Sequence, residues 1–84
     1  MDETGVTEKI RNFLLESFPH QGKSLENFTD LLNDWFVDSL GIIMTVVFLE
    51  KTFQIDIQSV DVNDENFHSI SSLTQFVLHR LPKR

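Results

Sequence analysis

The tripeptide Asp38-Ser39-Leu40 holds the residue types best placed to do chemistry in this sequence. A polar, turn-rich stretch ends there and a long apolar run begins, so we expect Asp38 to cap a helix by accepting from its first free amides. Ser39 is then predicted on the first helical turn, exposed to water at the end that favours negative charge. An exposed hydroxyl of this kind suits the covalent attachment of another group, although plain helix capping would also explain an Asp-Ser pair.

Apolar spacing predicts three long helices to position this motif. They run from Val6 to Phe18, from Ser39 to Thr52 or Phe53, and from Ser69 to Arg80. One short helix is expected over residues 64–67. The connection 19–37 between the first two long helices should pack across the bundle, with a helical turn near residues 28–32.

The segment Gln54–Gln58 alternates apolar and polar residues, which by periodicity alone predicts a strand. A lone strand has nothing to pair with in a helical chain, so we interpret it as an extended linker with Ile55 and Ile57 facing inward. Residues 1–84 are therefore expected to form a single all-α domain.

Composition excludes several classes of function. The net charge of −6 would repel nucleic acid, and with no cysteine there is no thiolate ligand, disulfide or cysteine nucleophile. The beginning of the chain is polar and acidic, unlike a signal peptide, and the longest apolar run, about ten residues, is half of what a membrane span needs. We expect a cytoplasmic protein without a metal site, since the acidic stretch after Asp61 has Asn66 where a calcium loop needs glycine.

The second helix is too apolar for a helix that faces one core. Its apolar residues cover nearly the whole circumference: Leu40, Ile42, Ile43, Met44, Val46, Val47, Phe48 and Leu49. In so small a protein some of these side chains should reach the surface beside Ser39. Either the long connection covers them, or they form a surface on which a partner docks.

A wider pattern gives the Asp-Ser-Leu motif a family context. The matching residues after Leu40 are Leu49, Glu50, Phe53, Ile55, Asp56, Ile57, Phe67, Ser69, Ile70, Leu73 and Phe76. With these spacings the chain resembles the acyl carrier and peptidyl carrier proteins, the phosphopantetheine-binding family. The resemblance implies an acyl-carrier-like four-helix bundle, with three main helices, one short helix and a long loop between helices 1 and 2. It also implies that Ser39 carries 4′-phosphopantetheine from coenzyme A and that Asp38 helps the modifying transferase.

By this resemblance the protein is not an enzyme but a monomeric carrier that holds acyl or aminoacyl groups as thioesters. Its implied partners are a phosphopantetheinyl transferase, an acyl-loading ligase or acyltransferase, and synthase or condensing enzymes. The cargo stays open between fatty acyl groups, polyketide intermediates and amino acids loaded by an adenylating ligase. An unmodified helical adaptor that binds through the apolar second helix is a further alternative.

The sequence departs from the family pattern in the second helix. Gly41 and Met44 stand where acidic residues are familiar, and Thr45 replaces an apolar residue that should face inward. In place of an acidic docking face we expect an apolar one built from Ile43, Met44 and Val47, with Glu50 at its edge. That suggests a dedicated set of partner enzymes.

Overall fold

The computed structural model describes residues 2–20, 22–36 and 38–82, which form helices and connections without a strand. The three long helices are α1 (Glu3–Ser17), α3 (Ser39–Phe53) and α5 (Ile70–Arg80). The short elements are α2 (Leu31–Asp34), the 3-10 helix η1 (Ser59–Asp61) and α4 (Asp64–Phe67). The all-helical class, the three main helices and the short helix at 64–67 are confirmed.

The short elements differ from the expectation of one short helix. The turn expected near residues 28–32 lies later, as α2, because Asp30 caps it by accepting from the Asn33 amide at 3.2 Å. The 3-10 helix η1 was not predicted, since three residues are too few to show an apolar period. Val37, the last residue of the expected connection, lies outside the described residues.

Side-chain caps and prolines decide where the long helices begin and end. The Asp2 carboxylate accepts from the Gly5 amide at 2.8 Å at the start of α1, and the Ser69 hydroxyl accepts from the Ser72 amide at 3.1 Å at the start of α5. Both helices stop just before a proline. The last turn of α3 ends at Gln54, which takes the left-handed conformation with φ 56°.

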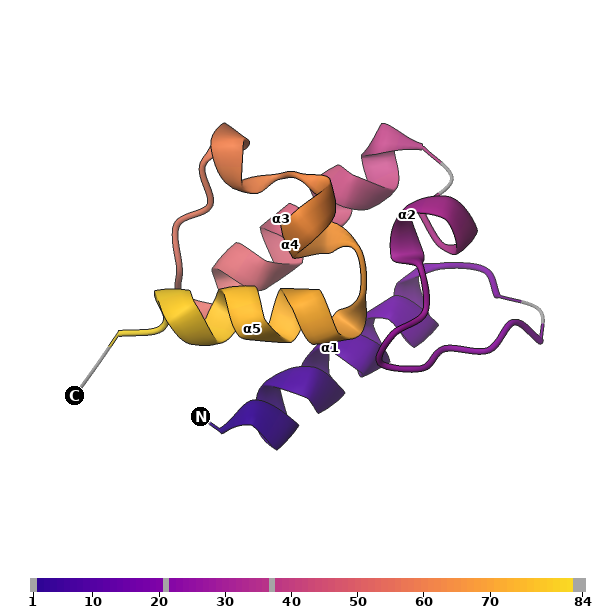
Figure 1. Cartoon of the computed structure of the whole chain (residues 1–84), viewed down its shortest axis with the longest axis horizontal. Coiled ribbons are helices and arrows are strands. Elements are labelled where there is room, and N and C mark those ends of the chain that lie inside the picture. Colours follow the sequence, from indigo (N-terminus) through magenta and orange to yellow (C-terminus); the bar gives the residue numbers. More distant parts are fainter. Residues whose placement is uncertain (1, 21, 37, 83–84) are drawn as a thin grey trace.

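The core lies where α1, α3 and α5 meet. Figure 1 shows α5 crossing α1, and the hydroxyls of Thr7 and Thr74 join these two helices at 3.0 Å. Parallel stacking of Phe13 on Phe48, with ring centroids 4.1 Å apart, joins α1 to α3. The buried apolar residues are Val6, Ile10, Leu14, Leu31, Trp35, Phe36, Leu49, Phe53, Ile55, Phe67, Ile70, Leu73, Phe76 and Val77. The radius of gyration, 12.0 Å, is close to the roughly 12 Å of a compact domain of this length.

The long connection between α1 and α2 packs against α4 and α5. The Asn27 carbonyl accepts from the Ser71 amide at 2.9 Å, and the His68 carbonyl accepts from the Leu31 amide at 2.8 Å. The Arg11 guanidinium donates to the Leu25 carbonyl and to the Asn27 side chain, so α1 holds the same connection from its other side. These bonds fix the connection away from the outer face of α3.

No strand forms over Gln54–Gln58, as predicted, but the linker is not extended throughout, because Gln54 takes the left-handed conformation. Ile55 is buried, and Ile57 is half-buried against the core. In Figure 1 the linker rises from the end of α3, near the level of α5, to η1, which lies above α5.

Candidate functional site

The first turn of α3 presents the predicted motif with the expected capping. Asp38 is extended, with φ −152° and ψ 177°, and one oxygen of its carboxylate accepts from the amides of Leu40 at 3.0 Å and Gly41 at 3.3 Å. Ser39 is the first residue of the helix, and its side chain is exposed. Within the described residues no hydrogen bond engages the Ser39 hydroxyl. The arrangement therefore leaves an exposed hydroxyl, with no bond to another described residue, at the positive end of a 15-residue helix.

Close packing beneath this turn positions it. Gly41 is buried, and a Cβ placed on it would lie 3.0 Å from the Phe18 ring and 3.5 Å from the Cα of Phe36. Phe18 and Phe36 face one another with ring centroids 5.5 Å apart. The missing side chain at position 41 thus lets the two aromatic rings approach the backbone of α3. This contact was not predicted, because the sequence marks Gly41 only as standing where an acidic residue is familiar.

The outer face of α3 is apolar and uncovered. Leu40 is 60% exposed, Ile43 56%, Met44 37% and Val47 44%. The spacing i, i+3, i+4 and i+7 places these four side chains on one stripe, which we call the α3 stripe. The buried residues of the helix lie on the opposite side: Gly41, Thr45, Leu49 and Phe53. The described part of the long connection therefore does not cover the stripe.

Thr45 faces inward, as predicted. It is completely buried, and its hydroxyl donates to the Gly41 carbonyl at 2.9 Å. The buried hydroxyl is therefore satisfied within its own helix, at the position where an apolar residue was expected.

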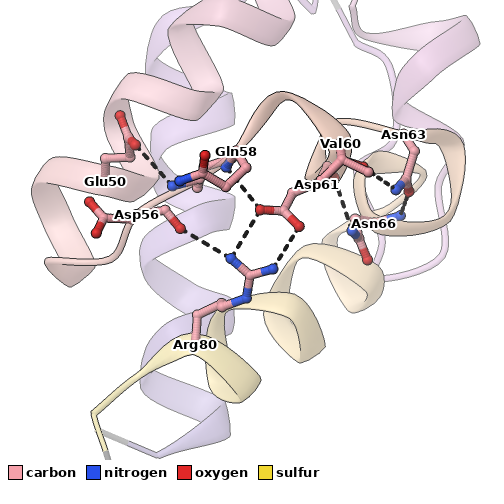
Figure 2. Close-up of polar contacts among 9 residues, drawn as sticks. Glu50, Asp56, Gln58, Val60, Asp61, Asn63, Asn66 and Arg80 are labelled. Carbon is pink, nitrogen blue, oxygen red and sulfur yellow. Dashed lines mark hydrogen bonds and ion pairs between the residues drawn. The ribbon is translucent and has the colours of Figure 1, made fainter.

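Glu50, which was expected at the edge of the apolar face, also has a partner within the chain. It is half-buried, and its carboxylate accepts from the Ile57 amide at 3.0 Å. Figure 2 shows this bond beside a larger polar network that ties the linker to α5. The role of Glu50 in the structure is thus to hold the chain that follows α3.

The centre of that network is the ion pair between Asp61 and Arg80. The two guanidinium nitrogens contact the two carboxylate oxygens at 2.6 and 3.0 Å, and Asp61 also accepts from the Gln58 amide at 2.9 Å. Arg80 further donates to the Asp56 carbonyl at 3.2 Å and lies over the Phe76 ring, 5.0 Å from its centroid. The hydrogen bond from Arg80, helped by the one from Gln58, holds the pKa of Asp61 below its ordinary value.

Sequence reasoning missed this pair. Asp61 was considered only as part of a failed calcium loop, and Arg80 only as the end of a helix. The two residues are 19 positions apart, and no local pattern marks them as partners. Only the fold shows the need for a partner, because Asp61 is 8% exposed and a buried carboxylate needs a counter-charge.

A surface depression of about 460 Å³ lies beside α2. It is lined by Lys23, Ser24, Thr29, Asn33, Asp34 and Trp35. The Lys23 ammonium donates to the Asp34 carbonyl at 2.8 Å, and the indole nitrogen of Trp35 is buried with no partner among the described residues. His20 stacks on the same indole, with ring centroids 5.6 Å apart. These groups are used in packing, and no carboxylate–base pair suited to catalysis faces the depression.

Neither a metal site nor a membrane span is found in the described part of the chain. No group of three or more His, Asp or Glu side chains is placed to hold an ion. None of the helices has the length and hydropathy needed to cross a bilayer.

Comparisons with known proteins add no relative. No model of a known protein family matches the chain. No curated protein matches it either.

Proposed function

We propose that this chain is an acyl carrier protein with an acyl-carrier-like four-helix arrangement, activated by attachment of 4′-phosphopantetheine to Ser39. In the attachment, the Ser39 oxygen bonds to the phosphorus of the pantetheine phosphate of coenzyme A. The bond from that phosphorus to the nucleotide breaks, adenosine 3′,5′-bisphosphate leaves, and the hydroxyl proton passes to a base of the transferase. The arm brings the thiol that the cysteine-free chain lacks, and that thiol holds acyl groups as thioesters.

The observation that carries the proposal is the exposed Ser39 hydroxyl on the first turn of α3. Asp38 uses its carboxylate to cap the amides of Leu40 and Gly41, so the serine oxygen is not needed as a cap. A phosphodiester placed there carries its negative charge at the positive end of the helix dipole, where such charge is stabilised. The same helix end thus exposes the hydroxyl to be modified and stabilises the negative charge of the product.

The rest of the architecture supports a carrier. Three main helices surround one core, and a long connection joins the first two of them, as the family resemblance implies. No catalytic group is required of the carrier, because tethering works by raising the effective concentration of cargo at a docked enzyme. The proposed partners are a phosphopantetheinyl transferase, a cargo-loading ligase or acyltransferase, and a synthase or condensing enzyme.

Intact mass of the purified protein tests the proposal after incubation with coenzyme A and a broad-specificity phosphopantetheinyl transferase. We expect a gain of one phosphopantetheine group, and complete loss of that gain in Ser39→Ala. Ser59→Ala is the matched control, because Ser59 is also an exposed serine at the first position of a helical turn. An unmodified wild-type chain, tested with transferases of several specificities, would contradict the proposal.

A peptidyl or aminoacyl carrier is the nearest alternative, and it differs in cargo alone. The two are separated by screening adenylating ligases against the protein that bears the phosphopantetheine arm but no cargo. An aminoacyl carrier would be loaded with an amino acid, and an acyl carrier with an acyl group.

The exposed α3 stripe favours a second candidate of a different class, an unmodified helical adaptor. In that case Ser39→Ala would leave partner binding intact, whereas Val47→Asp would abolish it. A carrier instead loses its function in both variants.

A further inference from the structure

The surface depression beside α2, which we call the α2 depression, has hydrogen-bonding capacity that the fold leaves unused. Its volume of about 460 Å³ is in the range of roughly 300–1,000 Å³ that small-molecule sites occupy. The indole N–H of Trp35, which lines it, is buried and has no partner among the described residues. Because a buried donor without an acceptor is unfavourable, the α2 depression suits a group that brings an acceptor.

The polar groups around the indole favour a neutral ligand that has both donors and acceptors. The Lys23 ammonium uses one of its three N–H donors, on the Asp34 carbonyl. The Ser24 hydroxyl and the Asp34 carboxylate form no hydrogen bond to another described residue. Since one ammonium and one carboxylate face the same depression, neither a free anion nor a free cation is preferred. Amide groups, each with one donor and one acceptor, match this lining better.

A group attached to Ser39 is long enough to reach the α2 depression. Trp35 lies four residues before Ser39, and even an extended chain spans at most about 14 Å over that distance. The backbone of a 4′-phosphopantetheine arm is about as long as five extended residues, or roughly 17 Å. The arm has two amides and a hydroxyl, which are the neutral donors and acceptors that the lining can bind.

Tethering lets a weak site of this kind be filled. A short flexible linker gives an effective concentration in the millimolar range, so a site with a dissociation constant of about 1 mM is roughly half occupied. The lining must open slightly before an acceptor meets the buried indole nitrogen. The exposed Lys23 side chain, which is held by a single hydrogen bond, can move aside for this.

We propose that the α2 depression holds the 4′-phosphopantetheine arm of Ser39 while no enzyme is bound, with an amide carbonyl of the arm accepting from the indole N–H of Trp35. This inference rests on the proposed carrier function and names the resting site of the arm. The site is built from α2 and the connection before it, not from α3. Because only a few hydrogen bonds hold the arm there, an enzyme that binds the arm can withdraw it.

The indole N–H itself gives the most direct test, by NMR. The chain has a single tryptophan, so one indole signal reports on the site. We expect this signal to shift, and its exchange with solvent to slow about twofold, when coenzyme A and a phosphopantetheinyl transferase modify Ser39. Free pantetheine at millimolar concentration should move the same signal in the unmodified chain.

A pair of lysine variants separates the α2 depression from general effects of charge. Lys23→Met removes donors from the lining, so the indole shift on modification should fall to half or less. Lys51→Met is the matched control, because Lys51 is also exposed but lies twelve residues after Ser39, about 18 Å along α3. The control should keep the full shift. Far-UV circular dichroism checks that both variants are folded, since Lys23 also bonds to the Asp34 carbonyl.

The reactivity of the arm gives a second test that needs no partner enzyme. Because the chain has no cysteine, the arm would supply the only thiol. Trp35→Phe removes the indole N–H and keeps an aromatic ring in the same place. Alkylation of the thiol by iodoacetamide should be about twofold faster in the modified variant than in the modified wild type, because a half-occupied site shields half of the arms.

Contrary results would overturn the inference in recognisable ways. An indole signal that is the same before and after modification would mean that the arm does not enter the depression. Equal shifts in Lys23→Met and the wild type, or an equal loss of shift in Lys51→Met, would mean that the signal reports charge and not binding. Equal alkylation rates would remove the assigned hydrogen bond. Failure of the wild-type chain to be modified at all would instead remove the carrier function on which the inference rests.

Discussion

The two ends of α3 are fixed by different physical means. At the N-terminal end one carboxylate caps the helix, and two aromatic rings pack on the bare backbone of Gly41. At the C-terminal end polar bonds hold the chain, from Glu50 to the linker and from Asp61 to Arg80. At the N-terminal end the Ser39 hydroxyl is exposed and has no bond to another described residue. At the C-terminal end the carboxylates of Glu50 and Asp61 are bonded within the fold. The first end therefore has a group that can be modified, whereas the polar groups named at the second end hold the chain in place.

The largest effect is expected from the packing at the N-terminal end. Gly41→Leu must force a side chain into space held by Phe18 and Phe36, and overpacking of this kind costs about 1–3 kcal/mol, partly offset by the better helix propensity of leucine. We expect a lower free energy of unfolding in urea denaturation. Combining Gly41→Leu with Phe18→Ala should lose less than the sum of the single losses. Strict additivity would show that the two residues do not share this space.

A second prediction concerns the C-terminal end of α3, where the carboxylate of Asp61 can be removed from the polar network. Asp61→Asn should lower Tm at neutral pH, because the ion pair with Arg80 is lost. The pKa of Asp61 is lower in the folded chain than its ordinary value near 4, so its contribution is present above that value and disappears as pH falls through the folded pKa. The variant should therefore lose less stability than the wild type between pH 6 and pH 3.

Asp56→Asn is the control for that measurement, since Asp56 meets Arg80 through its carbonyl and not through its carboxylate. Hydrogen bonding to Asn33 also lowers the pKa of Asp30, which adds its own loss of stability in acid. All three proteins retain that contribution, so the difference between the two variants reports Asp61. Parallel pH profiles for all three proteins would contradict the assignment.

The smallest effect is expected from the cap itself. Asp38→Ala removes the acceptor for the amides of Leu40 and Gly41, and loss of an N-cap costs about 1 kcal/mol. Asp38→Asn keeps an acceptor oxygen and should retain most of the stability. Thermal unfolding compares the two variants, and an equal fall in Tm would mean that the charge of Asp38, not its hydrogen bonding, stabilises the helix end.

Local features of the fold could be predicted from the sequence. The caps at Asp2, Asp38 and Ser69 act within three residues, and the apolar periods of the long helices repeat often enough to be recognised. The excess of apolar residues in α3 correctly indicated that some would remain exposed. The position of Ser39 at the first turn followed from the same local signals.

Features that depend on contacts through space could not be predicted in this way. The elements α2, which lies later than the expected turn, and η1 are too short to show an apolar period in the sequence. The bond between Glu50 and the Ile57 amide, the pairing of Asp61 with Arg80, and the fit of Phe18 against Gly41 join residues whose proximity only the folded chain creates. Of these contacts, the fit of Phe18 against Gly41 is the one that positions the first turn of α3.

The buried indole of Trp35 gives the molecule an internal optical reporter. It belongs to the sole tryptophan of the sequence, it is 3% exposed, and it lies four residues before Ser39. Its fluorescence therefore follows the opening of the segment that leads into α3, whereas far-UV dichroism averages over all helices. Coincident melting curves from the two signals would mean that this segment and the rest of the chain unfold as one cooperative unit.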